Sequence, residues 1–511
     1  MSELTVTGAS VTPISPTSGS EPSAWRSKLR ELRSHRWCDH AYWWFPALVT
    51  LVVVRYSAGR PVLGWDETAT WDSSTRSIPE LFALASNIDA ALTPYYLFMH
   101  GWIEVFGDSE VALRAPSILS TVVAVGLTAV LARRLFSPRI GLIAGLLLAI
   151  LPGITRYGQE VRPYGFALMF GTLATLLLFR ALDRSSGWRW AGYSLTVALL
   201  GLFQLMGLLL LLGHAAVVTE RVWRERGWKQ SVSLRSPALR WLIAAVVSVL
   251  PCLPLAYIAL GQRSQLFWLP PMKWDSFQNL PNDLFWSPLI GWFILGVALF
   301  AGALNRSAVR HLALIAVLPA VGLYVAAFFT PLWVPRYVFY TLPIWCLLAA
   351  IAVSARWWRV AVVFALVVAI GLPAHEYLRR TTGHDQADFR VAMQVIDGNY
   401  RPGDGMVYAP TSAWSIRSAV RYYLPENRPR DVLAVRSSLE TNTLETEECS
   451  NPRPCLDGVP RIWVFRPANL DSPLDRFPTR VASAIEDQYE VDQVWRLGNA
   501  TVGLYVRESS V

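Results

Sequence analysis

The sequence predicts an α-helical polytopic membrane protein that ends in a small C-terminal α/β domain. Of its 511 residues, 53% are hydrophobic and only 16% are charged, whereas soluble globular domains carry about 25% charged residues. The apolar residues gather in about eleven runs long enough to cross a bilayer. From about residue 385 the pattern changes to short strands and amphipathic helices separated by turns.

The predicted spans lie in one stretch of chain, and their flanks support the assignment. Many of the 23 Trp stand at the ends of apolar runs, where indole rings anchor to the membrane interface. The formal net charge of +9 is spread over short loops, which indicates membrane topology and argues against a nucleic-acid partner. The spans are expected near 41–60, 112–132, 140–155, 163–181, 190–204, 205–220, 239–260, 285–303, 311–330, 337–354 and 358–375.

The loop charges predict one orientation. Alternate connections, beginning with the basic N-terminal segment, carry most of the Arg and Lys, and the other loops carry clearly fewer. The positive-inside rule then places the N-terminus in the cytoplasm, and an odd number of spans places the C-terminal region outside. We expect a multi-pass membrane protein, with a disordered, basic 1–38, a membrane domain over 39–375 and an extracytoplasmic domain over 376–511; the bacterial plasma membrane is implied only by the family resemblance given below.

The C-terminal region reads as alternating helices and strands. Helices are expected over Asp388–Asn399, Ser412–Leu424 and Pro478–Tyr489, strands at Met406–Ala409 and Arg461–Phe465, and a final hairpin over Val491–Val506. Cys449 and Cys455 bracket a short polar loop and could close as a disulfide in an oxidising compartment, or remain two free thiols. This region shows no phosphate loop and no nucleophile elbow, so acceptor binding or shielding is a better expectation than chemistry.

Two adjacent acids, Asp66 and Glu67, follow the first span and open the longest outer loop. Carboxylates at a bilayer face are costly unless water, a substrate or a counter-ion attends them, so they are candidate catalytic residues. One could take a proton from a hydroxyl while the other tunes it or holds a metal. The alternative is that both only solvate the end of a span. In the same loop, stretches 78–88 and 95–106 predict helices that lie in the interface, and His100 is expected to be an ordinary interfacial histidine.

A second cluster, Arg156–Tyr164, lies between the third and fourth predicted spans on the same side. Arg156, Tyr157 and Arg162 are candidates for holding an anionic group, and Glu160 is a candidate catalytic acid. The alternative is a local ion pair between Glu160 and an arginine.

A third cluster, Trp333–Tyr337, opens the tenth predicted span. The guanidinium fork of Arg336 suits a phosphate, with Tyr337 beside it, although an arginine here could instead snorkel to lipid head groups. Arg263 and Lys273 are weaker candidates for the same role in the outer loop 261–284, which could also gate a lipid substrate.

Several classes of function are disfavoured. The sequence shows no P-loop, no ATP-binding domain and no Ser/His/Asp pattern, and no span carries a carboxylate–lysine chain for a proton relay. Polar side chains cluster at one membrane face instead of following a path across it. This argues against a channel or a pump.

At these residues the chain resembles the GT-C superfamily of membrane glycosyltransferases, and in particular bacterial enzymes related to protein O-mannosyltransferases and lipid A aminoarabinose transferases. The resemblance covers about residues 40–375. One departure is Asp89–Pro94, where a His-Pro-Pro often stands in the family. The stretches that carry the resemblance are Gly64–Glu67, Thr93–Leu97 with Phe106-Gly107, Leu113–Ser117, Arg156–Tyr164 and Pro335–Tyr337.

The resemblance implies transfer of a hexosyl or pentosyl group from a polyprenyl-phosphate-linked sugar to a hydroxyl of an envelope glycan, glycolipid or protein, with inversion. It implies that Asp66 is the general base, that Glu67 positions it or shares a divalent ion, and that Glu160 supports the acceptor or metal. Arg336 and Tyr337 would hold the donor phosphate. Mg²⁺ or Mn²⁺ is the only cofactor it suggests, with unknown ligands. A lipid or polysaccharide transporter and a non-catalytic scaffold remain alternatives.

Overall fold

The computed structural model describes residues 40–226, 236–304, 306–384, 387–409 and 413–508. The expectation for residues 1–38 therefore lies outside the described residues. Contacts group the chain into two units, 1–41 and 42–511. The predicted domain boundaries at 39 and 376 stay predictions.

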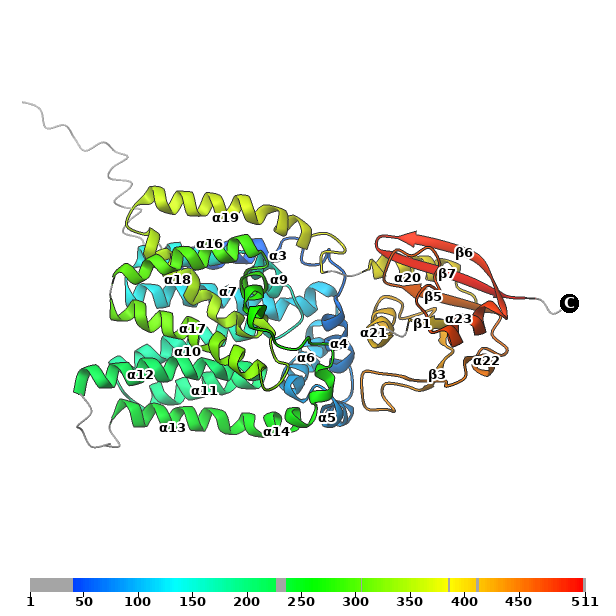
Figure 1. Cartoon of the computed structure of the whole chain (residues 1–511), viewed down its shortest axis with the longest axis horizontal. Coiled ribbons are helices and arrows are strands. Elements are labelled where there is room, and N and C mark those ends of the chain that lie inside the picture. The colour runs from blue at the N-terminus through cyan, green and yellow to red at the C-terminus, as the bar shows by residue number, and fades with distance from the viewer. Residues whose placement is uncertain (1–39, 227–235, 305, 385–386, 410–412, 509–511) are drawn as a thin grey trace, which may run out of the picture. The chain divides into compact units, whose positions relative to one another are not determined.

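The membrane part is helical, as predicted (Figure 1). Seven helices among the described residues are long and apolar enough to cross a membrane, or nine if two bent pairs each count as one span. A shorter apolar helix, α3 (Ala41–Arg55), precedes them. The chain is thus a multi-pass membrane protein. The seven helices are Glu110–Leu135, Tyr164–Asp183, Leu205–Arg224, Pro237–Gly261, Ser307–Ala327, Pro335–Val353 and Trp357–Leu378.

The span predicted over 140–155 is broken, and a second sharp bend lies at the start of the span predicted over 285–303. Helix α8 (Pro138–Ala149) and helix α9 (Pro152–Gly158) meet at 65°, and the segments Trp274–Phe285 and Pro288–Leu304 meet at 97°. In both pairs the second helix begins with a proline, whose missing N–H and fixed φ suit a first helical turn but not a helix interior. The prolines therefore end the first helix of each pair and redirect the chain.

Close approach of helices organises the bundle around α7 (Glu110–Leu135), which packs against α8 and α10 (Tyr164–Asp183). A Cβ on Gly165 would lie 2.6 Å from the carbonyl oxygen of Ser117, and one on Gly141 would lie 2.6 Å from that of Ala129. Glycine at these points lets the backbones meet, as is common between membrane helices. The contact at Gly165 brings the 156–164 segment against α7.

The first outer loop folds into helices. They are α4 (Trp65–Ser74), α5 (Ile78–Asn87), the 3₁₀ turn η1 (Ala90–Leu92) and α6 (Thr93–Phe106). The helices predicted over 78–88 and 95–106 are confirmed, and α4 is an addition. His100 binds the carbonyl of Ser74 through Nδ1 at 2.9 Å, which fits its expected structural role.

The C-terminal region contains a five-stranded mixed sheet in the order β2-β1-β5-β7-β6. Strand β1 (Gly405–Tyr408) is parallel to β2 (Arg430–Asp431) and β5 (Arg461–Arg466), and β7 (Ala500–Arg507) is antiparallel to β5 and to β6 (Tyr489–Leu497). The predicted α/β character is confirmed. Helices α20 (Phe389–Asn399), α21 (Ala413–Tyr423) and α23 (Thr479–Glu486) accompany the sheet, with a small β3 (Ala434–Arg436) and β4 (Glu447–Glu448) pair.

The predicted bridge between Cys449 and Cys455 is present. It encloses the short helix α22 (Pro452–Cys455). Of the two possibilities left open by the sequence, the structure has the disulfide.

Polar contacts join the C-terminal domain to the first outer loop. Arg421 on α21 pairs with the buried Asp72 of α4 at 2.5 Å. Glu110 accepts hydrogen bonds from Arg390 at 2.6 Å and from the Tyr423 hydroxyl at 2.6 Å. The domain therefore contacts the segment that carries Asp66 and Glu67.

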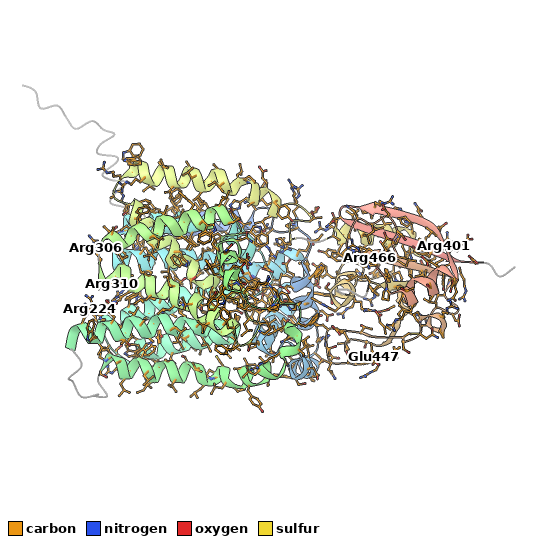
Figure 2. All side chains as sticks on the ribbon, viewed as in Figure 1. Arg224, Arg306, Arg310, Arg401, Glu447 and Arg466 are labelled. Atoms are coloured by element: carbon orange, nitrogen blue, oxygen red, sulfur yellow. A yellow bond between two sulfur atoms is a disulfide. The ribbon has the colours of Figure 1, made fainter. Side chains whose placement is uncertain are left out.

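Several cations predicted on one side of the membrane do lie together. Arg224, Arg306 and Arg310 gather at the same end of the helices in Figure 2, and Arg310 pairs with Glu220 at 3.0 Å. This grouping agrees with the charge pattern used for the topology. Which side faces the cytoplasm stays a prediction.

Candidate active site

Glu67 is the best-anchored acid of the site. It lies in the first turn of α4, and its side chain is 1% exposed beside the fully buried Arg114 of α7. Arg114 Nε and Nη2 donate to the two carboxylate oxygens at 2.9 and 2.8 Å. The backbone N–H groups of Gly64 and Val161 donate at 2.8 and 3.1 Å. Every lone-pair direction is in use, so this carboxylate acts as a structural centre.

His384, in the connection after α19 (Trp357–Leu378), completes this centre. Its Nδ1 lies 3.2 Å from Glu67 Oε2, and because Glu67 is ionised, Nδ1 carries the proton and donates. Burial lowers the pKa of His384 to about 4. Burial alone would raise the pKa of Glu67, but Arg114 and His384 outweigh it and hold that pKa far below its ordinary value. The group is thus an anionic carboxylate with a neutral imidazole.

Asp66, which precedes Glu67, has a more exposed side chain. Its side chain is 34% exposed, and it faces Arg162 Nη2 at 3.3 Å and Arg336 Nη2 at 3.7 Å. Burial raises the pKa of Asp66, but these two guanidiniums more than offset it and leave the pKa below its ordinary value. The structure thus brings together three predicted residues from three distant segments, with an ionised carboxylate that water or a substrate can reach.

Arg162 is contacted from its other side by Tyr96, which links it to Asp89, an acid outside the predicted set. The Tyr96 hydroxyl donates to Asp89 Oδ2 at 2.9 Å and accepts a hydrogen bond from Arg162 Nη1 at 3.5 Å. Asp89 has a left-handed backbone (φ 57°). The side chain of Gln262 accepts from the N–H of Ala90 at 3.0 Å, which fixes the turn.

Glu160 forms the local pair that the sequence left as an alternative. Its Oε2 lies 3.1 Å from Arg156 Nη1, and its side chain is 3% exposed. Burial raises the pKa of Glu160 above its ordinary value, although Arg156 opposes the shift. The guanidinium of Arg156 lies over the ring of Trp286, 5.1 Å from its centroid. Glu160 is therefore placed to orient Arg156 and has little access to a substrate.

The remaining predicted residues differ in position. Tyr157 donates its hydroxyl to the carbonyl of Asp283 at 2.6 Å and packs on Phe339, which is a structural arrangement. Tyr337 follows Arg336 in the 3₁₀ segment η7 (Pro335–Thr341). Arg263 is exposed on η4 (Arg263–Leu266) and borders a different cavity, of about 520 Å³, beside Phe267 and Phe329. No ion pair of the described residues joins Arg263 to Asp66.

The described residues include no group of three or more His, Cys, Asp or Glu that could hold a metal ion. Asp66, Glu67 and Glu160 each face a guanidinium instead. This donor set fits ion pairing better than a resident cation. Mg²⁺ or Mn²⁺ at this site stays a prediction from the resemblance.

Comparisons with known proteins bear on this geometry. Residues 92–257 match the family model described as dolichyl-phosphate-mannose-protein mannosyltransferase. The crystal structure of ArnT from Cupriavidus metallidurans in the apo state superposes with a TM-score of 0.61 at 13% identity, covering 90% of this chain and 97% of that one. The chain has the GT-C membrane glycosyltransferase fold.

Two further solved structures are similar to this chain. ArnT from the same organism bound to undecaprenyl phosphate gives a TM-score of 0.60 at 13% identity, with coverage of 90% and 97%. The archaeal oligosaccharyltransferase AglB from Archaeoglobus fulgidus, in complex with an inhibitory peptide and a dolichol-phosphate, gives 0.47 at 11% identity, with coverage of 86% and 70%. Comparison with curated protein sequences gives no match. The fold predicted from the motif resemblance is confirmed, and residues 92–257 carry the family-model match.

Sequence reasoning missed the partners of the acids. Arg114 entered only as part of a motif, and its position on α7, 47 residues after Glu67, gave no sign of contact. His384 had no signal, because a lone histidine in a polar connection is common. Asp89 stood out as a departure from a family pattern, and its position before Thr93-Pro94 was a usable hint.

Proposed function

We propose that this GT-C protein transfers a sugar from a polyprenyl-phosphate donor to a hydroxyl acceptor at the membrane surface, with Asp66 as the general base. The single observation that carries the proposal is the pairing of an accessible carboxylate with two arginines from separate segments. Asp66 is one-third exposed, and Arg162 and Arg336 lie 3.3 and 3.7 Å from its two oxygens. Such a site can hold a lipid phosphate beside a base.

The reaction follows from the charges. The acceptor O–H gives its proton to Asp66 as the acceptor oxygen bonds to the anomeric carbon of the sugar. The bond from that carbon to the phosphate oxygen breaks, and the electron pair leaves with the polyprenyl phosphate. Arg336 and Arg162 stabilise the charge that develops on the leaving phosphate. A single displacement of this kind inverts the anomeric configuration.

Donor binding also prepares the base. Without a donor, the two guanidiniums keep the Asp66 pKa low, and a low pKa makes a weak base. A donor phosphate that pairs with Arg336 and Arg162 would reduce their pull on Asp66 and raise its pKa toward that of a useful proton acceptor. In this proposal the long 3.7 Å contact of Arg336 is the one that the phosphate displaces first.

The other acids take supporting roles. Glu67 and Arg114 fix the first turn of α4 and thereby the direction of Asp66, while Glu160 orients Arg156 toward the same region. The proposed partners are a polyprenyl-phosphate sugar, an envelope glycan, glycolipid or protein acceptor, and membrane lipids. We further propose that the site faces the outside of a bacterial plasma membrane, as the loop charges predict.

The test is turnover by the purified protein with a panel of polyprenyl-phosphate sugars and hydroxyl acceptors. We expect release of polyprenyl phosphate with at least one donor, and loss of that release in Asp66→Asn. Glu104→Gln, an exposed acid on α6 in the same loop, is the control and should keep normal turnover. A folded Asp66→Asn variant with the normal rate would remove the catalytic assignment and favour the transporter or scaffold.

A further inference from the structure

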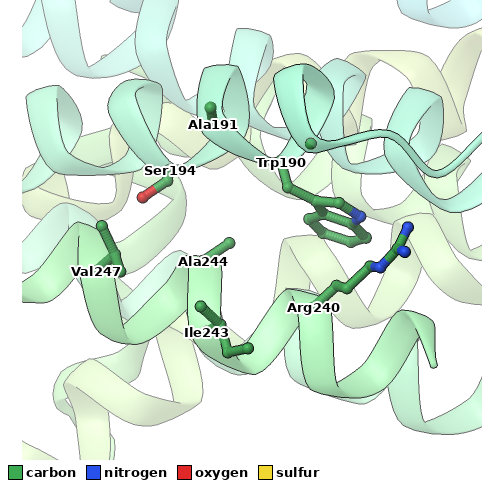
Figure 3. Close-up of a pocket in the computed structure, with 8 residues that line it drawn as sticks. Trp190, Ala191, Ser194, Arg240, Ile243, Ala244 and Val247 are labelled. Carbon is green, nitrogen blue, oxygen red and sulfur yellow. The ribbon is translucent and has the colours of Figure 1, made fainter. Parts of the chain in front are cut away.

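A groove lies between helices α11 (Gly187–Phe203) and α13 (Pro237–Val249), away from the residues of the candidate active site. The two helices pack side by side, and Figure 3 shows the side chains that face each other across the gap. The cavity has a volume of about 360 Å³, which is within the range of small-molecule pockets, about 300–1,000 Å³.

The walls of the groove are apolar and open outward. Small side chains of Ser194 and Ala244 form its floor, Ala191 lies on an exposed wall, and Ile243 and Val247 form one rim. Both rim residues are half-exposed, at 49% and 51%. On helices of this membrane part, exposed aliphatic side chains face lipid. The groove is therefore shaped to accept a hydrocarbon chain from the surrounding bilayer.

One end of the groove carries a guanidinium. Arg240 reaches toward the indole of Trp190 in Figure 3, and both side chains donate to Ser185 Oγ, at 2.7 and 2.9 Å. Ser185 is neutral, and no acid among the described residues forms an ion pair with Arg240. Most of its donors thus remain available at the mouth of an apolar groove.

The surroundings of Arg240 are also cationic. The nearby Asp183 is already bound by Arg134 and Arg221, at 2.6 and 2.9 Å. Among the described residues, Arg189 donates to backbone carbonyls of α10 and of the turn after it. Helices α11 and α13 both begin at this end, so the positive ends of their dipoles lie here. This concentration of positive charge favours binding of an anion.

We propose that this groove binds one anionic phospholipid, with the phosphate on Arg240 and one acyl chain between α11 and α13. A guanidinium binds phosphate oxygens bidentately, and basic pockets between membrane helices are suited to anionic head groups. The site is separate from the proposed donor site, since no described contact joins Arg240 to Asp66, Arg162 or Arg336. The ligand fills the groove that runs along the contact between these two helices.

The experiment is native mass spectrometry of the delipidated full-length protein titrated with phosphatidylglycerol in detergent. We expect one tightly bound lipid, and binding about tenfold weaker in Arg240→Gln, because a hydrogen bond to a charged group contributes about 1.5 kcal/mol or more. Arg306→Gln, which removes a cation from the same end of the helices (Figure 2), should bind normally. Ala191→Leu fills the groove from its exposed wall and should also weaken binding.

Other outcomes would overturn the proposal. These are equal binding of phosphatidylcholine, unchanged binding in both Arg240→Gln and Ala191→Leu, or tighter, Arg240-dependent binding of undecaprenyl phosphate in place of phosphatidylglycerol. Ala191→Leu keeps the test valid if Arg240→Gln does not fold. Failure of sugar transfer in the turnover assay would leave this result untouched, because lipid binding is read without any reaction.

Discussion

Asp66 and Glu67 follow one another in the first turn of α4, yet the side chain of one is 34% exposed and that of the other 1%. Successive residues of a helix point about 100° apart and do not share a face. Glu67 therefore turns into the protein toward Arg114, while Asp66 turns toward Arg162 and Arg336. The sealed ion pair fixes the backbone and the exposed one stays accessible, and we propose that only the accessible acid takes part in chemistry.

The largest expected effect concerns Asp66, the exposed acid of the pair. Asp66→Asn keeps the size of the side chain but removes the proton acceptor, so we expect sugar transfer to fall by about 10²–10⁴-fold. The melting temperature should change little, because Asp66 is partly exposed. Initial rates and thermal unfolding of the same preparation measure both. A large loss of stability would show that Asp66 belongs with Glu67.

The next effect concerns Glu67, the buried acid of the pair. Glu67→Gln leaves the Arg114 guanidinium buried without its counter-charge, and we expect a loss of about 3–5 kcal/mol in the free energy of unfolding. Thermal or denaturant unfolding in detergent measures it. Arg114→Lys should also lower the free energy of unfolding, although it keeps the charge, because a lysine cannot reproduce the bidentate contact with Glu67.

A matched control for this pair is Arg134→Lys. Its partner Asp183 is 43% exposed, and exposed pairs contribute at most about 1 kcal/mol. If Glu67→Gln cost no more than this control, the sealed centre would not be a structural anchor.

A smaller effect is expected at Tyr96, whose hydroxyl links Asp89 to Arg162. Tyr96→Phe removes the hydroxyl between Asp89 and Arg162, and a net hydrogen bond of about 1 kcal/mol corresponds to roughly a fivefold change. We expect this in kcat, with KM nearly constant, because Tyr96 positions Arg162 and is not expected to touch the donor. Tyr95→Phe, whose hydroxyl bonds none of the acids among the described residues, is the control. A loss confined to KM would contradict a positioning role.

A separate effect, read from stability rather than from turnover, is a pH dependence from His384. Its pKa is lowered by burial from 6.5 to about 4, so between these values the unfolded chain binds a proton that the folded protein does not. Stability is then full above pH 6.5 and falls on acidification toward pH 4, by at most about 1.4 kcal/mol per pH unit. Below about pH 4.5 the depressed pKa of Glu67 adds to the loss. His384→Gln should flatten the slope between pH 6.5 and 4, and an unchanged slope would contradict it.

Much of this molecule is predictable from local pattern. Long apolar runs such as 163–181 and 311–330 predicted spans that the structure forms as α10 and α17 (Ser307–Ala327), because hydrocarbon length sets helix length. The period of apolar residues located α20, α21 and α23. The run at 140–155 was misleading: it is apolar throughout, but Pro152 breaks it.

The candidate site was predictable in its members and not in their pairing. Asp66, Arg162 and Arg336 were selected as polar residues at the ends of apolar runs, and they meet. Tyr157 was selected on the same grounds, and its hydroxyl instead holds the backbone of Asp283. The sequence pattern alone could not distinguish Tyr157 from the three residues that meet, because all four are polar side chains beside a span.

The amino-acid sequence by itself indicated which segments are long and apolar enough to cross a membrane, where strands begin to alternate with helices, and which superfamily the motifs resemble. These properties follow from the hydropathy and periodicity of ten to twenty neighbouring residues, and both can be read from the local sequence. Only the tertiary structure decided which acid is sealed and which is open. That choice depends on Arg114, Arg162, Arg336 and His384, which reach α4 from four distant segments, and contacts of this range leave no local periodicity to read.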